Sequence, residues 1–250
     1  MEGIEYLHEL CEALPRCGPG DNNSTRRAYN AIPKPPDKPF ILDIGCGTGM
    51  QTLELARISN REIIALDNHQ GFLDILMKNA IDAGLQNRII PKNMSMLEMD
   101  FANRTFDLIW SEGALFCMGF QNGLKCCHEL LEAYGYLAVT ELVYIASDLP
   151  DDVTRYFERV YPDIKDIQGN IEAIREKGFN LVSNFTLPES AWLDNYYIPS
   201  EKVLPGLNKK YQGNEVALDV FEDFQNEINL YKKYSKFYGY EFFIMQKINK

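Results

Sequence analysis

The sequence predicts an α/β fold built on a mostly parallel sheet, and three observations lead to that prediction. An apolar strand, Phe40–Ile44, runs directly into a glycine-rich turn. A second apolar run, Ile63–Leu66, ends at an acidic residue, Asp67. Between residues 40 and 145, strand patterns alternate with helical patterns, and this alternation is typical of parallel strands joined by right-handed helical crossovers.

The first strand and its turn contain the run Leu42-Asp43-Ile44-Gly45-Cys46-Gly47-Thr48-Gly49. Glycine allows positive φ and brings bare main chain close to a ligand. A helical pattern with Leu53 and Ala56 on one face follows, so backbone N–H groups and a helix N-terminus face that ligand. Asp67, at the end of the second strand, can accept hydrogen bonds from both ribose hydroxyls. The sequence therefore predicts an adenosine-containing ligand.

The spacing of the glycines separates two kinds of adenosine cofactor. A dinucleotide fingerprint, G-x-G-x-x-G, needs its third glycine where this chain has Met50. Here the spacing is G-x-G-x-G, and Asp43 stands two positions before the first glycine. This run resembles motif I of the class I S-adenosylmethionine (SAM) dependent methyltransferases, D-x-G-x-G-x-G. The resemblance implies SAM as cofactor and S-adenosylhomocysteine (SAH) as product.

Later segments extend this resemblance in the same order along the chain. A third strand is expected at residues 88–91, and the family holds its adenine in the turn after that strand, here residues 93–97. The fourth strand and its turn, residues 105–113, contain Phe-Asp-Leu-Ile-Trp-Ser-Glu-Gly, which is similar to the family's next motif. Residues 135–141 resemble its fifth strand.

A closer resemblance covers almost the whole chain. It is to small bacterial and archaeal methyltransferases of the type 11-like group that carry R-x-G-P-G before motif I, here Arg16–Gly20, and L-P-E-x-x-W late in the chain, here Leu187–Trp192. This resemblance implies a Rossmann-like, seven-stranded, mostly parallel sheet with helices on both faces and an antiparallel last strand. It implies a methyltransferase acting on a small molecule and names no substrate.

Elements outside the core predict an N-terminal lid. Apolar residues at helical spacing predict a helix over residues 2–14, and Asn23-Ser24 is expected to cap a second helix through Tyr29. Four prolines, Pro33, Pro35, Pro36 and Pro39, predict a stiff connector into the first strand.

After the fifth strand the pattern changes. Helices are expected around residues 153–160 and 164–174, a strand at 179–186, an amphipathic helix at 216–231 and a last strand at 240–248. The wide gap between the last two strands predicts an inserted cap. We therefore expect one domain, residues 1–250, made of a helical lid (1–35), a SAM-binding core (36–145) and a substrate-side half (146–250) with a cap at about 187–235.

Composition narrows the partners. The 250 residues carry a formal net charge of −11, which argues against nucleic acid and anionic membranes as partners, since both attract basic patches. No apolar run is long enough to span a membrane, and the acidic N-terminus lacks a signal-peptide pattern, so we expect a cytoplasmic protein. We expect it to be a monomer or a homodimer. The six cysteines form no C-x-x-C pair, and Cys126-Cys127-His128 falls on a helical pattern typical of buried thiols, so no metal is expected.

Ligands of open α/β sheets bind at the carboxyl ends of the strands. The residues expected around SAM are Asp43, Gly45, Cys46, Gly47, Gly49, Asp67, Asn68, His69, Ser95, Met96, Ser111 and Gly113, with Arg16 and Gly20 from the lid. Some have alternatives. Asp43 either meets the cofactor's ammonium through water or supports the loop from below. Met96 covers adenine or packs in the core, and His69 borders the ribose or caps the next helix. Arg16 pairs with the methionine carboxylate, or its segment is a plain turn.

Two carboxylates and four aromatic residues are expected on the acceptor side. Glu112 and Glu141 end strands four and five and are the candidates to accept a proton or hold a cation; a solvated strand-end carboxylate is the alternative for each. Tyr144, Trp192, Tyr196 and Tyr197 are expected to line the acceptor pocket, with cap core as the alternative for Trp192. Methyl transfer from a sulfonium is an in-line displacement, so alignment and water exclusion are the main tasks.

Two other functions compete with a small-molecule methyltransferase. A non-catalytic SAM-binding regulator would keep the same motifs. A nicotinamide-dependent oxidoreductase is disfavoured by Met50 and by the absence of a separate catalytic domain.

Overall fold

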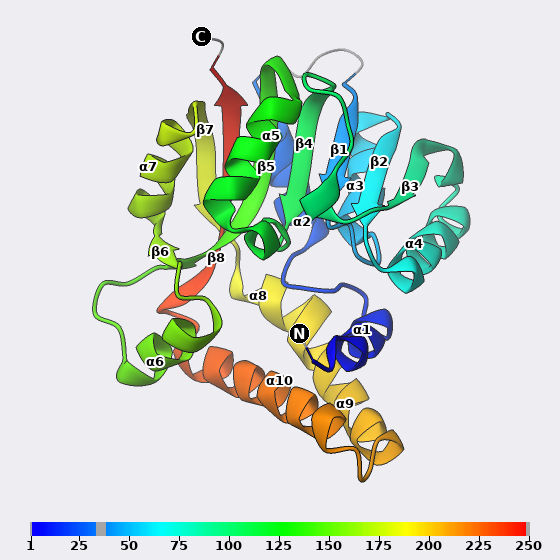
Figure 1. Cartoon of the computed structure of the whole chain (residues 1–250), viewed down its shortest axis with the longest axis vertical. Coiled ribbons are helices and arrows are strands. Elements are labelled where there is room, and N and C mark those ends of the chain that lie inside the picture. The colour runs from blue at the N-terminus through cyan, green and yellow to red at the C-terminus, as the bar shows by residue number, and fades with distance from the viewer. Residues whose placement is uncertain (1, 34–38, 249–250) are drawn as a thin grey trace.

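The structure is a computed structural model that describes residues 2–33 and 39–248 (Figure 1). Within those ranges one twisted sheet has the strand order β3-β2-β1-β4-β5-β8-β7, with β6 pairing β5 outside this path. The strands are β1 (Ile41–Ile44), β2 (Ile63–Asp67), β3 (Ile89–Asn93), β4 (Phe106–Glu112), β5 (Leu131–Tyr144), β6 (Lys165–Asp166), β7 (Phe179–Thr186) and β8 (Tyr238–Lys247). The expected seven-stranded path is confirmed, and the two-residue β6 is an addition that the sequence pattern did not predict.

Strand directions locate the ligand edge of the sheet. β1 runs parallel to both β2 and β4. From β1 the chain continues to β2 and β3 on one side and then crosses to β4 and β5 on the other, so the strand order reverses between β1 and β4. At such a switch point the loops after adjacent strands diverge and leave a crevice at the carboxyl ends of the strands. β8 runs antiparallel to β5 and β7, as expected for the last strand.

Helices cover both faces of the sheet, and their apolar sides form two cores. Leu53, Leu55, Leu73 and Leu76 of α3 (Met50–Ser59) and α4 (Gln70–Asp82) pack on one face. On the other face, Leu124 and Ile174 of α5 (Phe120–Leu130) and α7 (Ile167–Glu176) pack against alternate strand residues. Three short 3₁₀ turns complete the core: η1 (Gln86–Arg88), η2 (Met96–Glu98) and η3 (Leu115–Met118).

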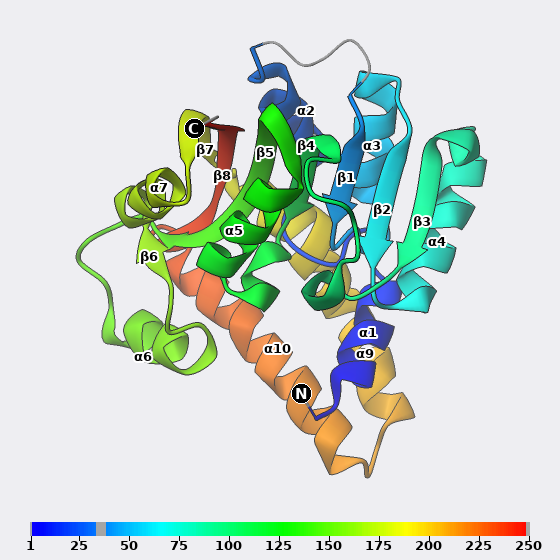
Figure 2. The ribbon, with the colours of Figure 1, turned by 45° about the horizontal axis from the view of Figure 1, so that its top comes forward.

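The lid and the cap meet below the carboxyl ends of the parallel strands (Figure 1). The lid consists of α1 (Ile4–Glu12) and α2 (Asn22–Asn30). Four elements lie between β7 and β8: α8 (Glu189–Trp192), the π-helical turn η4 (Leu193–Tyr197), α9 (Ile198–Lys210) and α10 (Glu215–Tyr234). The remaining helix, α6 (Asp151–Val160), follows β5. α1 packs against α9, α10 and α4, while α2 packs on α3, and Figure 2 shows α1 beside the cap helices.

Two details of the lid differ from expectation or lie beyond description. The cap of α2 is Asp21, whose Oδ1 accepts hydrogen bonds from the backbone N–H groups of Asn23 and Ser24; the assignment of the cap to Asn23-Ser24 was wrong. An Asp carboxylate just before the first turn also suits the positive end of the helix dipole. Of the proline connector, Pro35 and Pro36 lie outside the described residues.

No helix among residues 2–33 and 39–248 is both long and apolar enough to cross a membrane.

Candidate functional site

A cavity of about 260 Å³ opens at the switch point, where the carboxyl ends of β1, β2 and β4 meet the lid. Its lining comes from six segments that are far apart in the sequence: the lid turn, the glycine loop, the end of β2, α4, the turn after β3 and the end of β4. The lining residues are Arg16, Cys17, Gly18, Gly45, Cys46, Gly47, Thr48, Gly49, Gln51, Leu66, Asp67, Asn68, Phe72, Met94, Ser95, Met96, Leu97, Glu112, Gly113, Ala114 and Cys117.

The glycines of the loop have two different tasks. A Cβ at Gly45 would collide with the Ala114 side chain, and one at Gly49 would collide with Leu76, so both positions let neighbouring elements pack closely. Gly47 has φ of 52°, and a Cβ there would stand 3.0 Å from the Cys17 Sγ of the lid. Gly47 therefore faces the space between the loop and the lid, where a bound ligand would lie.

Asp67 ties the glycine loop to the end of β2. Its Oδ2 accepts a hydrogen bond from Gly47 N at 2.9 Å, and its Oδ1 accepts one from His69 N at 3.0 Å. A carboxylate has about four lone-pair positions, so acceptor capacity remains for ribose hydroxyls. Asn68 lines the cavity beside it. His69 is at the N-cap of α4 without a side-chain cap bond, and its Nε2 lies 2.6 Å from Glu12 Oε1 of α1, outside the cavity.

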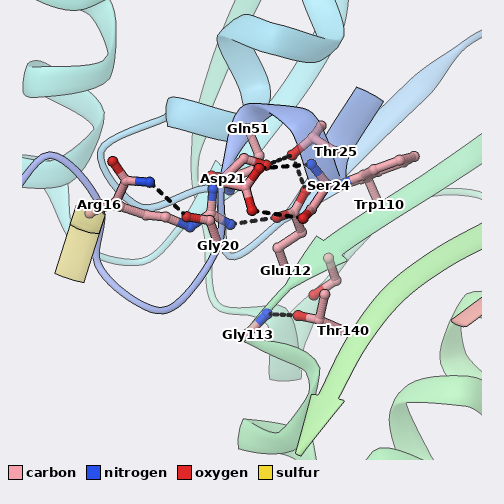
Figure 3. A network of polar contacts seen from close by, with 12 residues as sticks. Arg16, Gly20, Asp21, Ser24, Thr25, Gln51, Trp110, Glu112, Gly113 and Thr140 are labelled. Carbon is pink, nitrogen blue, oxygen red and sulfur yellow. Dashed lines mark hydrogen bonds and ion pairs between the residues drawn. The ribbon is translucent and has the colours of Figure 1, made fainter. Parts of the chain in front are cut away.

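Glu112 is the centre of a buried polar network that joins β4 to the lid (Figure 3). Arg16 Nη2 donates to its Oε2 at 2.6 Å, while the Thr25 hydroxyl and the Trp110 indole both donate to its Oε1 at 2.7 Å. The side chains of Glu112 and Arg16 are 0% and 4% exposed. Three donors already occupy Glu112, so this carboxylate acts as an anchor for Arg16 and not as an open proton acceptor.

Arg16 still has one free nitrogen. Its Nη1 is buried and has no hydrogen-bond partner among the described residues, although Arg16 lines the cavity. Leaving a charged donor unpaired in a protein interior is costly, so a partner is expected to come from a ligand. Gly20 makes room for this arrangement, because a Cβ there would collide with the Arg16 guanidinium. Gly20 itself does not line the cavity; its backbone N–H donates a hydrogen bond to Ala191 O of the cap at 2.9 Å.

Part of the cavity lining is apolar. Met96 lies there, with its methyl group 3.5 Å from the Cβ position of Gly45. Phe72 of α4 and Leu97 line the same region, and Ser95 begins η2 by accepting a hydrogen bond from Leu97 N at 3.2 Å. Flat apolar surface of this kind suits a heterocyclic base.

Four of the expected cofactor residues are absent from the lining of the cavity: His69 and Gly20, described above, and Asp43 and Ser111. Asp43 is fully buried; its Oδ2 accepts a 2.6 Å hydrogen bond from Thr52 of α3, which is the supporting position foreseen as the alternative. Burial raises the pKa of Asp43 to about 7, and the Thr52 bond offsets part of that rise. The Ser111 hydroxyl donates to Ile44 O at 3.0 Å and holds β4 to the start of the loop.

Glu141 lies on β5, three residues before the strand ends and outside the lining of the cavity, and it differs from Glu112 in having an oxygen without a partner among the described residues. The Tyr161 hydroxyl donates to its Oε1 at 2.6 Å, while Oε2 is buried with no partner in the part of the chain that the structure describes. Burial raises the pKa of Glu141 to about 8. Cys117, which lines the cavity, is influenced by both carboxylates. Burial raises the pKa of its thiol, and the charges of Asp67 and Glu141 both add to that rise.

The four aromatic residues expected in an acceptor pocket do not line this cavity. Tyr196 and Tyr197 are buried in the cap core, where the Tyr197 hydroxyl donates to Glu227 at 2.8 Å. Tyr144 packs edge-on against Phe157 of α6. Trp192 is buried on the cap side of Tyr240, with ring centroids 4.9 Å apart.

Sequence reasoning missed several lining residues. Gln51 follows the glycine loop by two residues, and Phe72 follows the Asp67–His69 segment by three. Both lie in the first turn of the helix that begins there, so their positions could have predicted that they line the site. Tyr240 gave no local signal and does not line the cavity. It packs behind Gly113, 3.3 Å from that residue's Cβ position, because β8 returns beside β5. Ala114 and Cys117 come from the turn after β4 and were equally hidden.

This fold and cavity define an α/β protein in which a glycine loop, the carboxylate of Asp67 and the buried Arg16 line one cavity at the carboxyl ends of the parallel strands. The family model described as a methyltransferase domain matches residues 41–135. Among curated proteins, the sterol 24-C-methyltransferase of Schizosaccharomyces pombe is 24% identical over 207 residues, which cover 79% of this chain and 52% of the relative. The chain thus spans about half the length of that relative.

Solved structures give the same assignment of the fold. A SAM-dependent methyltransferase from Thiobacillus denitrificans, solved with SAH, superposes with a TM-score of 0.82 at 15% identity and covers 99% of both chains. One from Geobacter sulfurreducens, also with SAH, gives a TM-score of 0.78 at 16% identity over 92% of both chains. Residues 41–135 therefore match a methyltransferase domain, and the chain has the fold of SAM-dependent methyltransferases.

Proposed function

We propose that this protein is an enzyme that transfers the methyl group of SAM to a small-molecule acceptor. The observation that carries the proposal is the pairing, across one cavity, of Asp67 on the glycine-loop side with the unpaired Nη1 of Arg16 on the lid side. SAM has a matching pair of ends: ribose hydroxyls on the adenosine and a carboxylate on the methionine.

These two ends fix the direction of the cofactor in the cavity. Adenine would lie against Met96 and Phe72, and the ribose beside Asp67 and Asn68. The methionine carboxylate would pair with Arg16, which Glu112 holds in place. The sulfonium would then lie near Gly113 and Cys117, facing the end of β5. Alignment of this kind is the main contribution a protein can make to an in-line displacement.

Glu141 is our candidate for the residue that meets the acceptor. Because its pKa is raised to about 8, Glu141 is largely protonated at pH 7, and only its deprotonated fraction can take a proton from the acceptor; its free Oε2 would be the atom that receives it, and kcat should rise with pH toward 8. Tyr161, bonded to Oε1, fixes the orientation of the carboxyl group. An acceptor whose nucleophilic atom carries a proton would lose that proton to Glu141 as the methyl group is transferred.

The acceptor is inferred to be a small molecule and not a nucleic acid, because a net charge of −11 repels phosphate backbones. The cytoplasm is the proposed location, with the protein as a monomer or homodimer.

Titration calorimetry and turnover test the two parts of this proposal separately. SAH should bind one site per chain and NAD should not compete; a protein that binds NAD and gives no heat with SAH would contradict the cofactor assignment. Labelled SAM over a panel of small amines, phenols, thiols and carboxylates should give a methylated product. SAH binding without any turnover would favour the non-catalytic regulator.

The role of Glu141 is tested by Glu141→Gln, with Glu132→Gln on the exposed start of the same strand as the matched control. We expect Glu141→Gln to lower kcat by about a hundredfold, the usual contribution of general acid–base catalysis, with the Kd for SAH unchanged. Unchanged kcat in a folded Glu141→Gln protein would remove Glu141 from the mechanism and leave the cofactor site intact.

A further inference from the structure

The lid helix α1 docks on the N-terminus of α4 through a cluster of side chains beside the cofactor cavity. Two histidine rings face each other there: His8 of α1 and His69 at the N-cap of α4 lie with ring centroids 4.1 Å apart and an interplanar angle of 35°. Both rings meet Phe72 of α4 edge-on, with centroid separations of 5.4 and 4.5 Å. We refer to these three side chains and Glu12 as the docking cluster.

The docking cluster also holds a carboxylate in a position shaped for it. Glu12, the last residue of α1, places its Oε1 2.6 Å from His69 Nε2. The same carboxylate lies over Gly71 in the first turn of α4, where a Cβ would collide with it. An acidic side chain beside a helix N-terminus also suits the positive end of the helix dipole. The missing side chain at Gly71 therefore gives α1 a fitted place on α4.

The docking cluster is linked to the cofactor cavity on two sides. The backbone N–H of His69 donates to Asp67 Oδ1 at 3.0 Å, and both Asp67 and Phe72 line the cavity. On the other side, α1 ends at Glu12, and the lid's part of the lining begins shortly afterwards at Arg16. The position of α1 therefore bears on the residues to which the proposed function assigns the ribose, the adenine and the carboxylate.

A proton on His8 opposes this docking. Burial lowers the pKa of His8 below its ordinary value, and the neighbouring His69 adds to that decrease. Three carboxylates act in the other direction without cancelling it: Glu5 and Glu12 on α1 itself, and Asp67 at the end of β2. The docked position therefore favours the neutral imidazole of His8.

The cap helices also pack on α1. From α9, Lys210 Nζ and the hydroxyl of Tyr211 both bond Glu9 at 2.6 Å, so the charge that α9 brings to α1 is matched there. From α10, Val220 packs against Gly3 at the N-cap of α1, which is an apolar contact. The charges that act on the imidazole are therefore those of the docking cluster and its neighbouring carboxylates.

We propose that His8 makes the lid sensitive to pH: α1 stays docked on α4 while His8 is neutral, and a proton on His8 releases α1 and weakens cofactor binding. The sign follows from linkage. An undocked His8 takes up a proton below about pH 6.5, whereas a docked His8 resists it. Docking therefore has its full strength above that pH and weakens as the pH falls, by up to about tenfold per pH unit for one proton. A proton on His69 would have the opposite effect, since it would strengthen the pair with Glu12.

Calorimetry with SAH between about pH 5.5 and pH 8 tests the proposal. The unaltered protein is compared with His8→Phe, which keeps an aromatic ring and cannot take up a proton. At about pH 5.5 the Kd for SAH should have risen by up to about tenfold more in the unaltered protein than in His8→Phe. Asp43, whose pKa is about 7, titrates in both proteins, so the difference isolates His8. His128→Phe, on α5, is the matched control and should follow the unaltered protein. Equal pH dependence in the unaltered and His8→Phe proteins would overturn the proposal.

The calorimetric test rests on the proposed function for its ligand, so a second measurement uses the free protein. At about pH 5.5, hydrogen exchange of residues 4–12 should be faster in the unaltered protein than in His8→Phe, and at about pH 8 the two should agree. Gly71→Ala should expel Glu12 and speed exchange of the same residues at both pH values. If SAH does not bind at pH 8, the cofactor assignment fails and the exchange comparison still decides the role of His8. Equal exchange of residues 4–12 in the unaltered and His8→Phe proteins at the lower pH would contradict that role.

Discussion

Arg16→Lys separates the two tasks of Arg16, which anchors the lid through one nitrogen and offers a second nitrogen to the cofactor cavity. Nη2 bonds Glu112 at 2.6 Å, and Nη1 has no partner within the described residues. A lysine keeps the positive charge and can keep the ion pair with Glu112. It has one nitrogen instead of a fork, so it cannot serve both carboxylates with the same geometry.

The expected magnitude follows from what is lost. A hydrogen bond between charged groups contributes about 1.5–3 kcal/mol, so the Kd for SAH should rise by roughly tenfold to a hundredfold. Removing the charge altogether would be far more damaging, because breaking a buried ion pair costs about 3–5 kcal/mol. Arg16→Lys avoids that loss, since Glu112 stays paired and keeps its bonds from Thr25 and Trp110.

The assay compares two ligands by titration calorimetry. SAH carries the amino-acid carboxylate, and 5′-methylthioadenosine lacks it. Arg16→Lys should weaken SAH and leave 5′-methylthioadenosine unchanged. Arg26→Lys is the matched control, because Arg26 lies in the same lid but bonds Glu54 and does not line the cavity. Equal weakening of both ligands in the Arg16→Lys protein would refute the carboxylate role and assign Arg16 to the lid alone.

Three further results are expected. Gly47→Val should abolish SAH binding and change Tm much less, because its side chain would enter the space between the loop and Cys17 at a positive φ; calorimetry and thermal unfolding together check this. Burial raises the pKa of Glu141 from 4.5 to about 8, so between these pH values the folded state holds a proton that the unfolded chain has released, and the free energy of unfolding should fall from about pH 5 to pH 8. Glu141→Gln should flatten that slope by up to about 1.4 kcal/mol per pH unit, measured by urea titrations at several pH values. Equal slopes in the two proteins would place the cause elsewhere. Hydrogen exchange should slow in residues 2–25 and 187–212 when SAH binds; a response confined to residues 45–49 would contradict closure of the lid on the ligand.

Local patterns predicted the half of the site that comes from single strand–turn–helix units. Gly45, Gly47 and Asp67 stand at the ends of adjacent parallel strands, and the spacing rules for such strands bring those ends together. Met96 and Gly113 follow the same logic after β3 and β4, the strands that flank β2 and β1. All five line the cavity, because each position depends on the backbone of one strand end and not on distant packing.

Contacts between segments far apart in the chain were not predictable. Glu112 was expected to be open to an acceptor, but Arg16 and Thr25, from 96 and 87 residues earlier, occupy it. Tyr196 and Tyr197 were expected to face a ligand. The π-helical turn over Leu193–Tyr197 shifts the helical register, and the side chains then face α10. Periodicity of the sequence alone contains no information about such a shift.

The lid is held by contacts of very different strength, and the difference indicates how a ligand enters. Arg16 and Thr25 bond a buried carboxylate, an arrangement that is expensive to open because Glu112 would lose its partners inside the protein. α1 is held at its polar face by Lys210 on Glu9 and by His69 on Glu12, which are exposed pairs of the kind that contributes little. We therefore expect the two exposed ion pairs of α1 to open more readily than the Arg16–Glu112 pair. Any movement of α1 would also expose Leu10, which is fully buried here, while Arg16 would stay oriented by Glu112.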